Sequence, residues 1–298
     1  MQDLPYRLRP GFALLLALGL GVVLGSTSAR GQSSITGEEV ECQNGAAAGH
    51  PCKQVDLLSH LSINALGGGP NTRLNDIWGW TDPQTGTEWA LVGRTDGVAF
   101  VDVSTPTEPA YVGQLPTHRD ASTWRDFKVY DNHLYVISES QNHGVQIFDL
   151  TQLRDVAPES RPKTFQATAR YSQVLSAHNI AINTETGFAY VVGGDGNGAS
   201  CGGGLHMMNL ENPTAPVFAG CFADPSTGRA GTGYTHDAQC TLYRGPDADY
   251  QGREVCFNAN ETALNIADVT DKGNPSTIAN ATYPKVGYTH QAWLTEDH

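Results

Sequence analysis

The chain has 298 residues and a formal net charge of −13 at pH 7, with 18 Lys and Arg against 31 Asp and Glu. This balance argues against nucleic acid or an anionic membrane surface as a partner, because both are bound by clustered basic residues. Only 16% of the residues are charged, while 33 are Gly and 16 are Pro. That composition favours a turn-rich, all-β chain and excludes a coiled coil or wholesale disorder.

The first 31 residues predict a signal peptide. Arg7 and Arg9 precede an apolar run at 12–24, and small residues follow it. A membrane anchor is the alternative, but the run is shorter than the ~20 residues that span a bilayer. Cleavage is expected at Thr27-Ser28-Ala29 or at Ala29-Arg30-Gly31. We therefore expect a secreted or cell-surface protein with no transmembrane segment in the mature chain.

Six cysteines follow, and none of them forms a Cys-x-x-Cys pair, which argues against a zinc ribbon or a thioredoxin-like redox motif. An even number in an exported chain indicates disulfides. Pairing of sequence neighbours predicts three bonds; one free buried pair is the alternative. The predicted bonds are Cys42–Cys52, which closes an N-terminal segment over 32–54, Cys201–Cys221 and Cys240–Cys256.

Residues 55–298 are predicted to form a repeat. One anchor recurs five times in steps of 50, 53, 58 and 54 residues, at positions 75, 125, 178, 236 and 290. A second anchor is an apolar run that ends in Asp or Asn, and it recurs four times, at positions 102, 149, 209 and 268. Runs rich in β-branched and aromatic residues lie between the two anchors, which is typical of strands. Each unit is thus expected to contain four strands in about 50 residues, as a propeller blade does.

The fold predicted is a β-propeller of four-stranded antiparallel blades. A β-sandwich does not explain the period, and a TIM barrel or doubly wound sheet needs helices where the chain offers one turn, at 151–156. Four units are complete and a fifth opens at Tyr288, which gives about four and a half blades. We expect a ring truncated at the C-terminus. The alternative is four blades that close by pairing of residues 288–298 with residues 57–66.

Several motifs resemble the choice-of-anchor B family, which comprises secreted LVIVD-repeat β-propellers. They are Val55-Asp56-Leu57-Leu58-Ser59-His60, Asn75-Asp76-Ile77-Trp78-Gly79, Ala177-His178-Asn179, Gly233-Tyr234-Thr235-His236-Asp237, Gly252-Arg253-Glu254-Val255-Cys256-Phe257 and Gly287-Tyr288-Thr289-His290-Gln291. The similarity covers roughly residues 38–298. It implies a propeller fold and an exported location, with varied C-terminal anchoring signals, and it implies no biochemical role. The chain departs from the family in having no such C-terminal signal, which favours truncation.

Polar residues at the first anchor form the strongest candidate site. The starts of equivalent inner strands are expected to converge on one mouth of the central channel. Imidazole and carboxylate groups there suit zinc or another transition metal, and a set of carboxylates with amide oxygens suits calcium. The alternative is a polar plug that binds water and backbone. The candidate residues are His178, His236, His290, Asp76, Asp126 and Asp237.

Glu139, Asp195 and Glu261 follow the second strand of successive units and form a weaker set at one rim. Paired carboxylates can act as acid and base, although solvated loop residues are the favoured interpretation. Asp195 and Asn197 form a short oxygen-rich loop that suggests calcium. The five tryptophans are interpreted as packing between blades rather than as a sugar platform.

Two classes of function remain. The favoured one is a non-enzymatic, exported binding, adhesion or surface-associated module, with or without a metal at the channel mouth, whose partner is an extracellular protein, a glycan or a small ligand. The alternative is a metal-dependent hydrolase of the lactonase-like or phosphoesterase-like propeller type. The first is favoured because the sequence offers no paired nucleophile and base.

Overall fold

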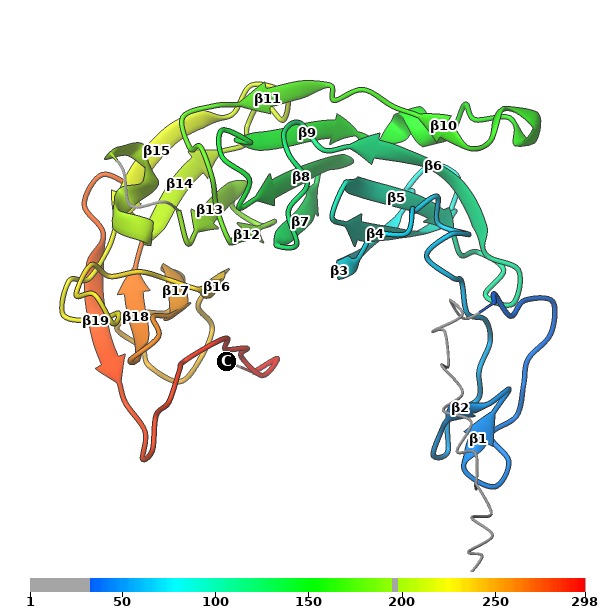
Figure 1. Cartoon of the computed structure of the whole chain (residues 1–298). Coiled ribbons are helices and arrows are strands. Elements are labelled where there is room, and N and C mark those ends of the chain that lie inside the picture. Colours follow the sequence, from blue (N-terminus) through cyan, green and yellow to red (C-terminus); the bar gives the residue numbers. More distant parts are fainter. Residues whose placement is uncertain (1–32, 195–197, 298) are drawn as a thin grey trace, which may run out of the picture. The chain divides into compact units, whose positions relative to one another are not determined.

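The computed structural model describes residues 33–194 and 198–297, so the predicted signal peptide and Asp195 lie outside the described residues. Residues 33–298 belong to one compact unit. The described part is all-β, as predicted, with four antiparallel sheets that follow one another in chain order (Figure 1). None of the described helices is long and apolar enough to cross a membrane.

Each sheet contains four strands in antiparallel order, which agrees with the predicted unit. Sheet 1 contains β3 (Leu74–Thr81), β4 (Glu88–Arg94), β5 (Gly97–Asp102) and β6 (Ala110–Pro116). Sheet 2 contains β7 (Arg125–Tyr130), β8 (His133–Ser138), β9 (Val145–Asp149) and β11 (Ala169–Tyr171). Sheet 3 contains β12 (Asn179–Asn183), β13 (Phe188–Val192), β14 (Leu205–Asn209) and β15 (Val217–Phe222). Sheet 4 contains β16 (Asp237–Leu242), β17 (Glu254–Ala259), β18 (Leu264–Asp268) and β19 (Ser276–Ala281).

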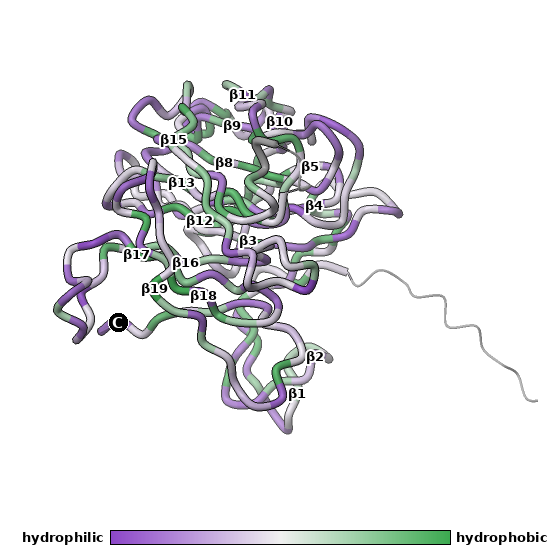
Figure 2. Tube along the Cα trace, turned by 90° about the vertical axis from the view of Figure 1, so that its left-hand side faces the viewer, coloured by the Kyte–Doolittle hydropathy of each residue, from purple (hydrophilic) through white to green (hydrophobic). Residues whose placement is uncertain are grey.

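The first strand of each sheet lies beside the first strand of the next. Strand β7 contacts both β3 and β12, and β12 contacts β16, so the predicted anchors do begin neighbouring inner strands. The faces between sheets are filled by apolar side chains. Phe127 of β7 packs on sheet 1, and Ile180 of β12 packs on sheet 2. Hydrophobic stretches accordingly run along the strands while hydrophilic stretches lie mainly in the loops (Figure 2).

The connection inside sheet 2 departs from the predicted repeat. After β9 the chain forms the 3-10 turns η1 (Leu150–Leu153) and η2 (Pro158–Ser160), and then β10 (Lys163–Thr164). Strand β10 pairs in parallel with β6 and adds a fifth strand to sheet 1. The backbones of β10 and β6 lie so close together that a Cβ placed on Gly113 would lie 2.2 Å from the backbone oxygen of Lys163. Glycine at this position is therefore what allows the extra strand to pair.

All three predicted disulfides are present. The Cα atoms are 5.8 Å apart in Cys42–Cys52, 5.3 Å in Cys201–Cys221 and 4.0 Å in Cys240–Cys256. The first bond encloses a hairpin of β1 (Ala46–Ala47) and β2 (His50–Pro51). The last joins directly opposite residues of β16 and β17.

The alternative prediction, in which residues 288–298 pair with residues 57–66 to close a ring of four blades, is wrong about this pairing. Leu57 and His60 form bridges with Val40 and Ile35, so this segment pairs with the N-terminal residues rather than with residues 288–298. Thr289 instead forms a bridge with Glu261, at the end of sheet 4. The four sheets therefore do not close on one another through these two segments.

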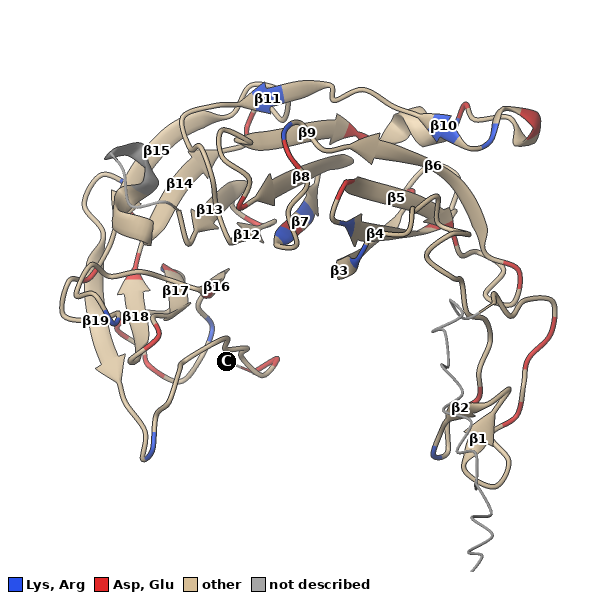
Figure 3. Ribbon diagram, in the orientation of Figure 1, with Lys and Arg blue, Asp and Glu red and all other residues tan. Residues whose placement is uncertain are grey.

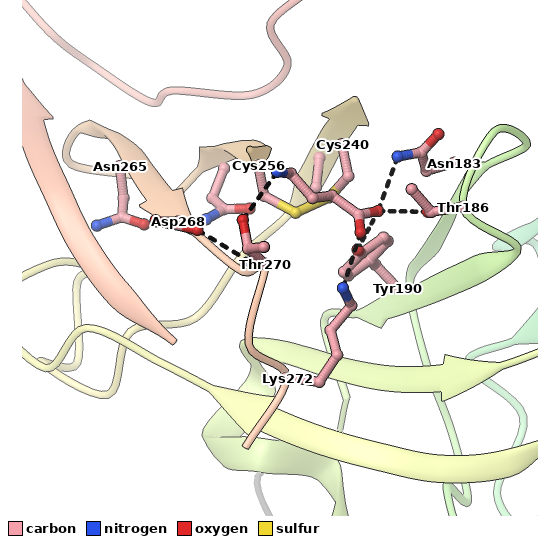
Figure 4. The surroundings of a disulfide bond; sticks show 12 residues. Asn183, Thr186, Tyr190, Cys240, Cys256, Asn265, Asp268, Thr270 and Lys272 are labelled. Atoms are coloured by element: carbon pink, nitrogen blue, oxygen red, sulfur yellow. Dashed lines mark hydrogen bonds and ion pairs between the residues drawn. A yellow bond between two sulfur atoms is a disulfide. The ribbon is translucent and has the colours of Figure 1, made fainter. Parts of the chain in front are cut away.

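A buried carboxylate ties sheet 3 to sheet 4 beside the Cys240–Cys256 bond (Figure 4). The Oε1 atom of Glu254 accepts hydrogen bonds from Asn183 Nδ2 at 2.7 Å, Thr186 Oγ1 at 2.7 Å and Tyr190 OH at 2.5 Å. Its Oε2 atom lies 2.7 Å from Lys272 Nζ. Only 3% of Glu254 is exposed, so four partners compensate one buried charge.

Candidate functional site

A cavity of about 420 Å³ lies where the inner strands begin. Its lining comes from the first residues of β3, β7, β12 and β16 and from residues 290–293. All six residues of the strongest predicted set line this single cavity. They are Asp76, Asp126, His178, His236, Asp237 and His290.

The three histidines form a row. The ring centroids of His178 and His236 are 4.2 Å apart, as are those of His236 and His290, with interplanar angles of 50° and 35°. The Nδ1 atom of His236 lies 2.8 Å from the backbone oxygen of His290, which can only accept, so Nδ1 carries the proton. Nδ1 of His178 likewise faces Glu139 Oε1 at 2.5 Å. In the neutral ring of His236 the lone pair is therefore on Nε2.

His236 is held in the neutral form. Burial is the largest cause, and the neighbouring His178 adds repulsion, so the pKa of His236 falls to about 4 although the bond to His290 opposes the shift. A neutral imidazole with a lone pair on Nε2 can accept a hydrogen bond or bind a metal at neutral pH.

Two carboxyl groups of the cavity interact. Asp126 accepts hydrogen bonds from Lys128 Nζ at 2.7 Å and from the backbone nitrogen of Ile180 at 2.8 Å, which stabilise its charged form. Burial, and then the hydrogen bond and the charge of Asp126, raise the pKa of Asp76 to about 7. Asp76 thus keeps a proton near neutral pH that it can share with Asp126. Burial also raises the pKa of Asp237.

Four polar side chains at the anchor tie one unit to the backbone of the next. Asn75 donates to the backbone oxygen of Arg125, and Asn179 donates to that of His236 at 2.9 Å. The bonds of Asp126 to Ile180 and of His236 to His290 do the same. These contacts match the polar-plug interpretation, since they satisfy strand ends at the interface between units.

Two of the weaker carboxylates, Glu139 and Glu261, lie near Tyr234, and the third, Asp195, lies outside the described residues. Burial raises the pKa of Tyr234 to about 12, and the charges of Glu139 and Glu261 contribute. Glu261 Oε2 accepts a hydrogen bond from the backbone nitrogen of Arg229 at 2.7 Å. Tyr234 belongs to one of the two Gly-Tyr-Thr-His motifs, from which only the histidine is predicted as a site residue.

The tryptophans divide into two groups. Trp80 and Trp89 are 7% and 6% exposed and fill the core between sheets 1 and 2, as predicted. Trp124 and Trp293 are 54% and 77% exposed and line the cavity, so packing between blades is the wrong interpretation for them. Trp78 also lines the cavity and lies 4.5 Å beneath Lys128 Nζ.

The described residues contain no group of three His, Cys, Asp or Glu side chains already arranged as metal ligands. The donor chemistry nevertheless fits a metal in one respect. Histidine ligands usually donate the other ring nitrogen to a carboxylate or a carbonyl, as His178 and His236 do here. Metal binding therefore stays a prediction.

No protein-family model matches the chain, and no curated protein matches it. Among solved structures, it is similar to the extracellular domain of a one-component system from B. thetaiotaomicron, with a TM-score of 0.44 and 16% identity over 71% of this chain and 25% of that one. It is also similar to a protein from Lactobacillus plantarum, with a TM-score of 0.39 and 13% identity over 70% of this chain and 52% of that one. A third similar structure is a quinonprotein alcohol dehydrogenase-like protein from Bacteroides thetaiotaomicron, with a TM-score of 0.34 and 11% identity over 70% of this chain and 55% of that one. The chain thus spans between a quarter and about half of these proteins, and similarity at this level says nothing about function.

Proposed function

We propose that the chain is an exported β-propeller module that binds a ligand in the cavity at the start of its inner strands. One observation carries this proposal: polar side chains from all four sheets and two exposed indoles line the same cavity. Its volume of about 420 Å³ lies within the range of small-molecule sites.

Three disulfides support export. All six cysteines are paired, and disulfides persist outside the reducing cytoplasm. The resemblance to the choice-of-anchor B family points the same way, toward a secreted or surface-associated protein. Membership of that family is part of the proposal.

The exposure of Ile77 on β3 supports a propeller ring with more than the four sheets described above. Phe127, Ile180 and Ala238 lie at equivalent anchor positions near the start of β7, β12 and β16 and are 0%, 1% and 9% exposed, because each packs on the preceding sheet. Ile77 is their equivalent on β3 and is 61% exposed. We infer that a further four-stranded sheet of the same repeat covers this face of β3 in the assembled propeller.

Among the candidate ligands, a glycan fits the lining best. Trp124 and Trp293 present flat apolar faces, while Gln291 and Asp76 offer polar groups beside them. Sugar rings stack on such faces and use their hydroxyl groups to bind amides and carboxyls. A metal held by Nε2 of His178 and His236 would supply a Lewis acid that binds a ligand oxygen.

The test is tryptophan fluorescence of the full chain titrated with a panel of neutral oligosaccharides. We expect at least one to change the emission, and Trp124→Ala to weaken that response at least tenfold. Trp89→Phe, in the buried core, is the matched control and should keep it. No response to any member of the panel would contradict a glycan site.

Metal binding needs a separate test. Zinc or calcium added after EDTA treatment should raise the melting temperature, and His236→Gln should remove the effect of zinc, because a metal that binds only the folded state stabilises it. His133→Gln is the control, since this histidine bonds the backbone of Asp131 outside the cavity. Equal melting curves with and without metal would leave only the polar plug.

A second function, that of a hydrolase, is supported by the Asp76–Asp126 pair. A protonated carboxyl beside a charged one is the arrangement that acid–base catalysis needs. Lactone, phosphoester and glycoside substrates should then be hydrolysed by the wild type and not by Asp76→Asn. Absence of activity on all three classes, with and without zinc, would exclude this function for those substrates.

A further inference from the structure

Five basic side chains form a cluster on sheet 2, outside the histidine row. Arg125 begins β7, Arg170 lies on β11, and His118, Arg119 and His143 lie in the loops after β6 and β8. Basic segments are visible on β7 and β11 in Figure 3. Three of these side chains are arginines, and they gather in a chain with a net charge of −13.

None of the three arginines in this basic cluster forms an ion pair within the part of the chain that the structure describes. Arg94, Arg154, Arg244 and Arg253 do, each within 4.0 Å of a carboxylate, whereas the other described arginines, Arg73, Arg161 and Arg229, do not. The charge of Asp96 acts on Arg125, but Asp96 is engaged by Arg94 at 2.8 Å. Asp120 follows Arg119 but makes no ion pair with it.

Arg125 is the buried arginine of the cluster. It is 2% exposed, and its guanidinium reaches the backbone oxygen of Arg94 at 3.1 Å, Thr117 Oγ1 at 2.8 Å and His143 Nε2 at 3.2 Å. His143 Nδ1 donates to the backbone oxygen of Gly144 at 2.8 Å, so Nε2 accepts from Arg125 and the ring is neutral. Burial holds the pKa of His143 at about 4. A buried guanidinium whose partners are all neutral lacks the anion that usually compensates it.

A shared backbone carbonyl brings the other two arginines, Arg119 and Arg170, together. Both donate to the backbone oxygen of Asn142, Arg119 through Nε at 3.4 Å and Arg170 through Nη2 at 2.5 Å. Arg170 Nε also donates to the backbone oxygen of His143 at 2.8 Å. The two guanidinium groups therefore share one carbonyl despite their like charge, and N–H groups of both remain available.

We propose that the basic cluster is an oxyanion-binding site that receives a sulfate, phosphate or carboxylate group of the ligand. Guanidinium groups present pairs of N–H donors that match the oxygens of such groups, and an anion between them relieves their mutual repulsion. That repulsion helps to lower the pKa of Arg170, which burial lowers most and the charge of Arg119 lowers further. Arg125 and Trp124 also line the cavity, so an anionic ligand can occupy both places.

The probes are inorganic sulfate, inorganic phosphate and acetate, each measured by isothermal titration calorimetry with the full chain at constant ionic strength in chloride. We expect binding of sulfate or phosphate, and a dissociation constant at least tenfold weaker in Arg119→Gln and in Arg170→Lys. The lysine variant keeps the charge and loses the pair of donors. Binding of acetate alone would assign the site to carboxylates.

Arg253→Gln is the control, because it removes an exposed arginine outside the cluster and should leave binding unchanged. Melting curves of each variant show whether it is folded. Equal binding by the wild type and both cluster variants would overturn the proposal, as would no binding of any probe. The idea that one ligand uses both places rests on the proposed function, but this test succeeds or fails separately from the glycan test, since inorganic anions do not need the indoles.

Discussion

Replacement of Glu254 by alanine removes the acceptor that joins sheets 3 and 4. Four donors lose their partner at once: the side chains of Asn183, Thr186 and Tyr190 at Oε1 and that of Lys272 at Oε2. Asn183 is 4% exposed and the side chain of Lys272 is 10% exposed, so water does not readily replace the carboxylate. The substitution therefore leaves a buried ammonium group unpaired.

The magnitude follows from that unpaired charge. Removal of one partner of a buried ion pair costs about 3–5 kcal/mol of the free energy of unfolding. Glu254→Gln keeps a carbonyl oxygen for Asn183, Thr186 and Tyr190 but places an amide against Lys272, so about 1–3 kcal/mol is expected. At roughly 2–4 °C per kcal/mol for a domain of this size, alanine should lower the melting temperature by about 10 °C.

Urea unfolding with the disulfides intact measures these costs. The double variant Glu254→Gln, Lys272→Met should be more stable than the sum of its single effects predicts, because it removes the uncompensated charge. The expected loss for Glu254→Ala is about 3–5 kcal/mol, so a free energy of unfolding within about 1 kcal/mol of the wild type would refute the reasoning. So would a glutamine variant less stable than the alanine variant.

Other predictions address the disulfide, the titrating groups and the β3 face. Replacing Cys240 and Cys256 together by alanine should lower the free energy of unfolding by about 3 kcal/mol in urea titrations, since the bond closes a loop of 16 residues. The pKa of Asp76 is raised in the folded state to about 7, so its contribution to stability is lost as pH rises to 7, and Asp76→Asn should gain stability relative to the wild type between pH 4 and pH 7 in melting curves. The pKa of His236 is lowered to about 4, so its contribution is lost as pH falls from 6.5 to 4, and His236→Gln should lose less stability than the wild type over that range in EDTA. Ile77→Asp should lower the melting temperature by several degrees if a further sheet covers β3, and a neutral result would contradict that sheet.

The sequence predicted the inner strands and the disulfides because both are local patterns. The anchors at Asp76, Asp126 and Asp237 recur at a nearly constant spacing, and each begins a strand that lies beside the next. Cys240 and Cys256 are sequence neighbours that a hairpin brings face to face. In each case a short stretch of sequence contains both the residue and the reason for its position.

Features that depend on distant segments were missed. Strand β10 has two exposed residues with no alternation, and only its pairing with β6 defines it. Arg119 and Arg170 are 51 positions apart, and they come together only because both bind the backbone of Asn142. Exposure of Trp124 likewise depends on which neighbours the fold supplies, which the residue type alone does not indicate.

The convergence of polar residues in the cavity is partly a consequence of the repeat itself. Each inner strand needs side chains that bind the backbone of the next, and Asn75, Asn179 and Asp126 serve that need. A ligand must therefore use the atoms that these contacts leave available. Within the described residues, Nε2 of His178 and His236 makes no hydrogen bond, and Oδ2 of Asp76 is buried without a partner. Substitutions at those three residues should change binding more than stability, whereas substitutions at the three backbone-binding residues should do the reverse.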